Sequence, residues 1–90
     1  MMILIRYFDW FGTNEALEKE RNAWIKASKE MEGIKSIRLV TSYQARYHYA
    51  WMIETDSYDN LQELNSRARK YNPRDKKVLT HTIVEIFDEL

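Results

Sequence analysis

Apolar and polar residues alternate along three segments of the chain, and a fourth segment, the first in the sequence, is apolar almost throughout; together these patterns predict four β-strands. The alternation is clearest after Arg46, where large aromatic or aliphatic side chains occupy every second position. The first segment differs, because it is apolar at nearly every position except Arg6 and Asp9, which is typical of a central strand covered on both faces. The predicted strands are residues 2–10, 34–43, 47–54 and 78–88.

Apolar residues recur every three or four positions in two further segments, which predicts two helices. Thr13 is expected to cap the first helix, which should run to about Glu32 and end where Gly33 can adopt a left-handed conformation. Asp56 and Ser57 are expected to cap the second helix. The lysines and glutamates of the first helix should be solvated, and its buried stripe should be Leu17, Trp24, Ala27, Ser28 and Met31.

The element order β-α-β-β-α-β predicts a ferredoxin-like α+β fold, with a four-stranded antiparallel sheet and two helices on one face. The first and third strands should lie in the centre of the sheet, because they are the most apolar. A turn is expected at Gln44 and Ala45, and a loop at residues 72–75, which hold the only proline. No long linker divides the sequence, so residues 1–90 should form one domain.

The alternation also assigns side chains to the two faces of the sheet. If the odd residues of the third strand point at the helices, the helix side holds Ile3, Ile5, Tyr7, Ile37, Leu39, Tyr49, Trp51, Ile53, Thr82, Val84 and Ile86. The opposite face then holds Leu4, Arg6, Phe8, Arg38, Val40, His48, Met52, Glu54, His81, Ile83, Glu85 and Phe87.

This opposite face is too apolar to be left in water, yet it carries charges of both signs. Such a face is typical of a homodimer interface, which would also protect the edge strands. Arg6 could pair with Glu54 or Glu85 across neighbouring strands. The polar residues expected at the interface are Arg6, Arg38, His48, Glu54, His81 and Glu85.

Composition narrows the class of partner. Fourteen basic and fourteen acidic residues give a formal net charge of zero, which argues against a dedicated binder of nucleic acids or anionic membranes. Without cysteine there is no thiolate zinc site and no cysteine nucleophile. His48 and His81 lack metal-ligand spacing, so no metal site is expected, and each is either a hydrogen-bonded interface residue or a catalytic one. No membrane span or signal-peptide core is recognisable, so a cytoplasmic protein is expected.

Two segments carry a resemblance to a known group of proteins: residues 32–37, Glu-Gly-Ile-Lys-Ser-Ile, and residues 49–57, Tyr-Ala-Trp-Met-Ile-Glu-Thr-Asp-Ser. With the size and element order, they resemble the dimeric α/β-barrel superfamily, which includes antibiotic-biosynthesis-type monooxygenases, muconolactone isomerase-like proteins and stress-responsive barrel domains. The resemblance implies two sheets packed face to face in a homodimer, with a cavity in each subunit between sheet and helices. Haem-degrading members use an Asn on the first strand and a Trp and a His near the second helix. In this chain the predicted first strand carries Asp9 but no Asn, and the predicted second helix contains neither Trp nor His, so haem degradation is not expected.

The resemblance implies a protein that binds a small aromatic or polyketide-like molecule without a cofactor. If it is an enzyme, cofactor-free oxygenation or isomerisation is implied, and a non-catalytic structural or regulatory dimer is the alternative. Aromatic side chains between sheet and helices could equally form a packed core or surround a flat ligand. The residues expected to bind the ligand are Tyr7, Asn14, Trp24, Tyr49 and Trp51.

Single-stranded RNA binding is a second class of function to weigh. RNA-recognition motifs share the element order, and residues 49–52 resemble the aromatic centre of their third strand. The glycine expected early in that motif is missing, since Tyr47 and His48 stand there, and the net charge is zero. The predicted alternation also turns Tyr49 and Trp51 toward the helices, where neither could stack on a base. Nucleic acid is therefore not the expected partner.

Overall fold

The computed structural model describes residues 1–43 and 46–90, without the side chain of His81. The turn expected at Gln44 and Ala45 lies outside this description. Four strands form one sheet in the order β2-β3-β1-β4, and the paired strands are antiparallel. The elements are β1 (Met2–Trp10), α1 (Asn14–Ser28), β2 (Ile34–Thr41), β3 (Tyr49–Thr55), α2 (Asp59–Tyr71), the short 3-10 helix η1 (Lys76–Val78) and β4 (Leu79–Asp88).

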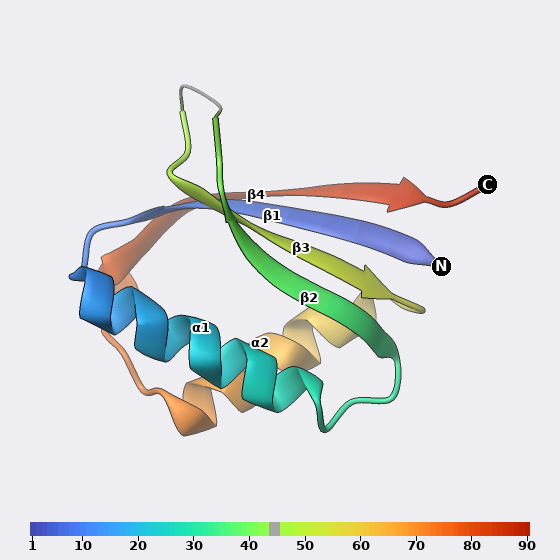
Figure 1. The fold of residues 1–90 in the computed structure, drawn as a ribbon, viewed down its shortest axis with the longest axis horizontal. Helices are drawn as coiled ribbons and strands as arrows, with labels where there is room; N and C mark the ends of the chain where they lie inside the picture. Colours follow the sequence, from blue (N-terminus) through green and yellow to red (C-terminus); the bar gives the residue numbers. More distant parts are fainter. Residues whose placement is uncertain (44–45) are drawn as a thin grey trace.

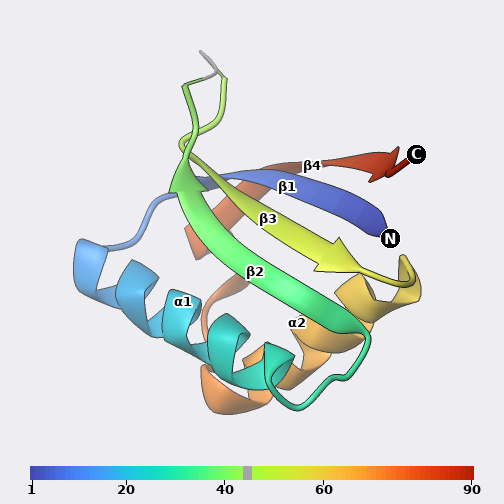
Figure 2. The ribbon, with the colours of Figure 1, turned by 45° about the vertical axis from the view of Figure 1, so that its right-hand side comes forward.

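Both helices cover the same face of the sheet, and the opposite face is open (Figures 1 and 2). The two most apolar strands, β1 and β3, lie side by side in the centre, as predicted. The ferredoxin-like architecture expected from the element order is therefore confirmed.

Helix α1 begins as predicted but ends earlier. The Thr13 hydroxyl accepts a hydrogen bond from the backbone N–H of Ala16 at 3.0 Å, whereas the helix stops at Ser28 rather than near Glu32. The Ser28 hydroxyl donates to the carbonyl of Ile25 at 2.7 Å, and such local bonds compete with helical ones. The predicted left-handed cap at Gly33 is also wrong, because its backbone lies outside that conformation.

A larger residue at position 33 would have to displace two neighbouring side chains. A Cβ atom there would lie 2.4 Å from Nδ2 of Asn60 and 2.6 Å from Oδ1 of Asp56. The same stretch of backbone is tied to β3, since the Thr55 hydroxyl donates to the Gly33 carbonyl at 3.0 Å. Helix α2 then begins at Asp59, whose N–H donates to the Ser57 hydroxyl at 3.3 Å.

The predicted facing of β1 was wrong. Residues directly opposite one another in paired strands share a face, and the register places Leu4, Arg6 and Phe8 opposite Ile53, Trp51 and Tyr49. Leu4 and Phe8 are fully buried beneath the helices. Ile3, Ile5 and Tyr7 therefore lie on the open face, contrary to the prediction. Because β1 is apolar on both faces, its pattern did not distinguish its two possible phases.

The facing predicted for β2 and β3 is confirmed, and the register places Val84 and Ile86 of β4 on the helix side, as predicted. Trp51 and Ile53 of β3 are buried on the helix side. Their neighbours from β2, Ile37 and Leu39, are partly buried on the same side. Trp51 stacks on Trp24 of α1 with ring centroids 5.0 Å apart. This pair forms the centre of a solid core, which also includes Leu4, Phe8, Ala27, Ile53, Leu61, Leu64 and Ala68.

Candidate functional site

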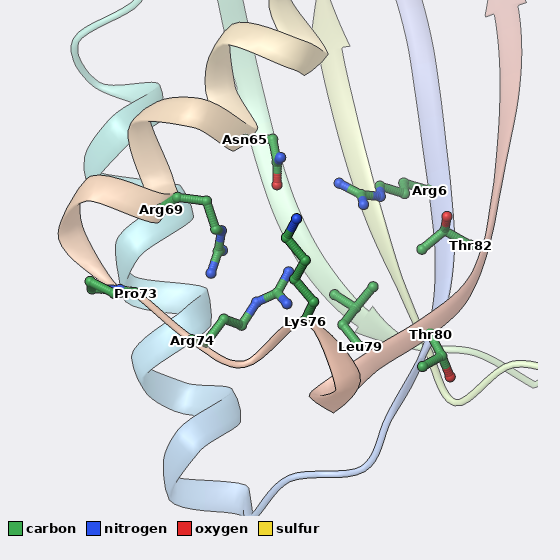
Figure 3. A pocket seen from close by; sticks show the side chains of 9 residues that line it. All are labelled: Arg6, Asn65, Arg69, Pro73, Arg74, Lys76, Leu79, Thr80 and Thr82. Atoms are coloured by element: carbon green, nitrogen blue, oxygen red, sulfur yellow. The ribbon is translucent and has the colours of Figure 1, made fainter.

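A cavity of about 600 Å³ lies on the helix side of the sheet, between α2 and strands β1 and β4 (Figure 3). We call it the helix-side cavity. Its walls come from segments far apart in the sequence, because the first and last strands are neighbours in the sheet. The cavity is lined by Arg6, Asn65, Arg69, Pro73, Arg74, Lys76, Leu79, Thr80 and Thr82.

Arg6 extends into the cavity from the central strand β1, because it lies on the same face of the sheet as Leu4 and Phe8, toward the helices. Its guanidinium carbon lies 5.5 Å from the ring centroid of Trp24, a distance at which a cation is attracted to an aromatic face. Among the described residues, no hydrogen bond or ion pair of this guanidinium to a carboxylate is found. Burial, and then the positive charges of Arg74 and Arg69, lower the pKa of Arg6.

A buried carboxylate, Glu20, organises the opposite wall. This residue of α1 is fully buried. It accepts hydrogen bonds from Nε of Arg74 at 2.7 Å, from Nδ2 of Asn72 at 2.9 Å, from Nε1 of Trp24 at 3.3 Å, and from a guanidinium N–H of Arg69. Burial alone raises the pKa of Glu20, but these hydrogen bonds from arginine and asparagine outweigh it and leave the pKa below its ordinary value.

The burial of this carboxylate was not predicted, since the glutamates of the first helix were expected to be solvated. A signal for it was present. Glu20 stands four residues before Trp24 and three after Leu17, so it lies within the buried stripe of the helix. A charge at such a position needs a partner, and no cation could be assigned to it from spacing alone.

The helix-side cavity is strongly electropositive. Four cationic side chains line it, and Glu20 is the carboxylate that contacts two of them, which leaves an excess of three positive charges. Figure 3 shows Arg6, Arg69 and Lys76 extending into the space between α2 and the sheet. Guanidinium and ammonium groups donate hydrogen bonds and carry positive charge, so this lining can bind or stabilise negative charge on a ligand.

The predicted ligand residues do not lie together. Trp24 and Trp51 are packed against each other in the core, and half-buried Tyr49 stacks on Phe8 at 5.9 Å. Asn14 is exposed at the start of α1. Tyr7 lies on the open face, where it lines a shallow hollow with Ile5, Val40 and Met52. None of the five residues lines the helix-side cavity.

The predicted interface residues are also divided between the two faces. Arg38, Glu54 and Glu85 belong to the open face by their register, whereas Arg6 lies on the helix side. The expected pairing of Arg6 with Glu54 or Glu85 is therefore wrong. Instead, the Ser36 hydroxyl donates to Glu54 at 2.9 Å, and a hydrogen bond to Glu85 raises the pKa of Tyr7.

His48 lies just before β3, beside the end of β1. Its Nδ1 atom accepts a hydrogen bond from the backbone N–H of Trp10 at 3.3 Å, and its own backbone N–H donates to Oδ1 of Asp9 at 3.2 Å. These bonds give His48 a structural role at the sheet end. The predicted role of His81 concerns a side chain outside the described part of the structure.

Two further findings concern metal binding and membrane spanning. In the part of the chain that the structure describes, no three His, Cys, Asp or Glu side chains gather closely enough to hold a metal ion. No described helix has both the length and the apolar character needed to span a membrane.

Several solved structures share this fold at low sequence identity. A dimeric ferredoxin-like protein of unknown function from Thermobifida fusca is 16% identical, with 96% of this chain and 88% of that chain covered and a TM-score of 0.70. SnoaB, a cofactor-independent oxygenase from Streptomyces nogalater, is 10% identical, with 99% and 92% covered and a TM-score of 0.70. A variant of MhuD with two manganese protoporphyrin IX molecules bound per active site is 18% identical, with 100% and 95% covered and a TM-score of 0.72.

No model of a known protein family matches the sequence, and no curated protein matches it. The likeness therefore concerns the fold, and it extends over nearly the whole chain. The β-α-β-β-α-β order, the sheet order and these neighbours together confirm the ferredoxin-like fold predicted from the sequence, which is the fold that the resemblance implied.

Proposed function

We propose that the protein binds a small organic molecule in the helix-side cavity. The observation that carries the proposal is the cavity itself, because about 600 Å³ lies within the usual size range of ligand sites. Polar side chains from β1, α2 and β4 line it together with the apolar Leu79 and Pro73. Two proteins of the same fold support the proposal, since SnoaB is described as an oxygenase and MhuD holds a porphyrin in its active site.

The lining favours a different ligand chemistry from the one expected. A cavity walled by tyrosine and tryptophan was anticipated, whereas arginine, lysine and threonine predominate. Cofactor-free oxygenation or isomerisation remains our candidate reaction. Both can proceed through a carbanion or enolate of the substrate, and fixed cations stabilise such developing negative charge. The carboxylate of Glu20 is bound by Arg69 and Arg74, so it is not free to act as the general base that removes a proton from the substrate. The substrate would therefore need to lose that proton readily.

A homodimer through the open sheet face is the second part of the proposal. Ile83 and Phe87 of β4 are 46% and 47% exposed there, beside the partly covered Ile3, Ile5 and Met52. Exposed apolar area of this kind on one face is typical of a protein interface. The Thermobifida fusca protein of the same fold is described as dimeric, which supports the proposal.

A fragment screen followed by two-dimensional NMR of the uniformly labelled protein tests the binding site. Hits should shift backbone resonances of the residues that line the cavity, and Thr82→Trp should abolish their binding by filling the space. Ser66→Trp, on the exposed side of α2, is the matched control and should leave binding unchanged. Hits that cluster at the hollow around Ile5 and Met52 instead would place the ligand site on the open face.

A further inference from the structure

The helix-side cavity holds more positive charge than its surroundings neutralise, and we infer that its ligand carries a compact anionic group with two negative charges, such as a phosphate monoester or a dicarboxylate. The inference rests on the proposed function, since it names the class of molecule that the same cavity takes. The anionic group would be bound by Arg6, Arg69 and Lys76, with the rest of the molecule against Leu79 and Pro73.

Arg6 is the strongest indication. A guanidinium that leaves water normally gains a carboxylate or several hydrogen bonds in return. Glu20, the buried carboxylate of the site, contacts Arg69 and Arg74. Arg6 lies over the face of Trp24 and makes no hydrogen bond or contact ion pair to a carboxylate among the described residues, and the more distant attraction of Glu20 is outweighed by repulsion from Arg74 and Arg69. A structural ion-pair network therefore accounts for two of the cations and leaves Arg6 unexplained. A ligand that supplies the missing negative charge accounts for it.

Arg69 adds a second indication. One of its terminal guanidinium nitrogens binds Glu20 and the other donates to the carbonyl of Asn72 at 2.9 Å, but its Nε atom is buried without a hydrogen-bond partner. Glu20 and Asn72 thus fix the plane of this guanidinium and leave the Nε–H donor unused. Guanidinium N–H groups donate strong hydrogen bonds to phosphate and carboxylate oxygens. The Thr82 hydroxyl lies on the same wall as Arg6 and can donate a further hydrogen bond (Figure 3).

The location of the charge indicates a small molecule rather than a polymer. The cations gather in one cavity beneath the sheet, while the chain as a whole has no net charge. A nucleic-acid backbone would need positive charge spread along an extended surface. A cavity of about 600 Å³ matches one small organic anion.

The test compares three probes that share one aromatic ring system: 1-naphthyl phosphate, 1-naphthoate and the uncharged 1-naphthol. Their affinities are measured by isothermal titration calorimetry on the full chain, with Arg6→Met as the test variant. Arg21→Met is the matched control, because it removes the same charge from an exposed position on α1. Lys76→Met, at an exposed lining position outside the core, serves as a second test variant if Arg6→Met fails to fold.

We expect 1-naphthyl phosphate to bind most tightly and 1-naphthol least. Arg6→Met should weaken binding of the phosphate about 10- to 100-fold, the change that loss of charged hydrogen bonds produces, and should leave 1-naphthol unchanged. Arg21→Met should have no effect.

If 1-naphthol binds as tightly as the phosphate and Arg6→Met changes neither affinity, the anion inference is wrong while the proposed small-molecule site stands. If Arg21→Met weakens binding as much as Arg6→Met, the phosphate merely adsorbs to the surface. If no probe binds at millimolar concentration, both proposals fail.

Discussion

The Nε atom of Arg74 lies 2.7 Å from the Oε2 atom of Glu20, although 54 positions separate the two residues in the sequence. The contact ties the loop after α2 to the middle of α1, and the carboxylate also holds Arg69. One buried acidic residue thus positions two of the four cations of the helix-side cavity. The stability of the cavity wall and its affinity for anions therefore depend on the same side chain.

Glu20→Gln should lower the free energy of unfolding by about 3–5 kcal/mol at pH 7, because it leaves buried guanidinium groups without their counterion. The loss should depend on pH. The pKa of Glu20 is lowered from its ordinary value of 4.5 in the folded protein, so its stabilising contribution is complete above that value and is lost as pH falls through the folded pKa. Urea denaturation between pH 7 and pH 3 should show the variant and the parent converging at the acidic end.

Glu18→Gln, two residues away and exposed, is the control for this series. It should change the free energy of unfolding by less than about 0.5 kcal/mol at neutral pH, as is usual for surface positions. A Glu20→Gln loss of the same small size would mean that the ion pairs with Arg69 and Arg74 contribute little.

Arg6→Met should make the protein more stable. The guanidinium is partly buried without a carboxylate, so an apolar side chain of similar length should raise the free energy of unfolding by about 1 kcal/mol. Loss of the contact with Trp24 offsets at least half of this gain, since an Arg over an aromatic ring contributes about 0.5–1 kcal/mol, so the net increase should be at most about 0.5 kcal/mol. Thermal unfolding of Arg6→Met, with Arg21→Met as control, measures the sign. A lower melting temperature would show that Arg6 is held for stability rather than for binding.

The fold could be predicted because β2 and β3 alternate and the helices carry clear apolar stripes. The phase of β1 could not, since Leu4 and Ile5 are equally good core residues and only the pairing with β3 decides between them. That one shift moved Arg6 from the predicted interface into the cavity. Arg69 and Arg74 could not be placed either, because a cation on a polar helix or in a loop looks the same in the sequence whether it faces water or a buried carboxylate.

Trp51→Ala should cost about 3–5 kcal/mol, the usual range for removing a large buried aromatic side chain. Trp51 is 1% exposed and stacked on Trp24, so its loss opens a void in the centre of the core. Tyr43→Ala, at a side chain that is 98% exposed, is the control and should be close to neutral. Unfolding in urea measures both. A stable Trp51→Ala variant that had lost affinity for ribo-oligonucleotides would instead support the RNA-binding alternative.

Phe87→Glu should dissociate the proposed homodimer, because it places a charge on the apolar part of the open sheet face that β4 contributes. Light scattering at micromolar concentration should give about twice the chain mass for the parent and the mass of one chain for the variant. Tyr58→Glu is the matched control, since Tyr58 is exposed to a similar degree, 46% against 47%, but lies at the start of α2. A monomeric parent protein would contradict the proposed homodimer.

The most direct test of the cationic cavity is NMR of the arginine side chains while 1-naphthyl phosphate is added. The Nε–Hε resonances of Arg6 and Arg69 should shift together and saturate, because both guanidinium groups face the helix-side cavity. Those of Arg21 on α1 and Arg38 on the open face should stay in place. Shifts of Arg38 with Arg6 and Arg69 unmoved would contradict the account, since they would place the anion on the opposite side of the sheet.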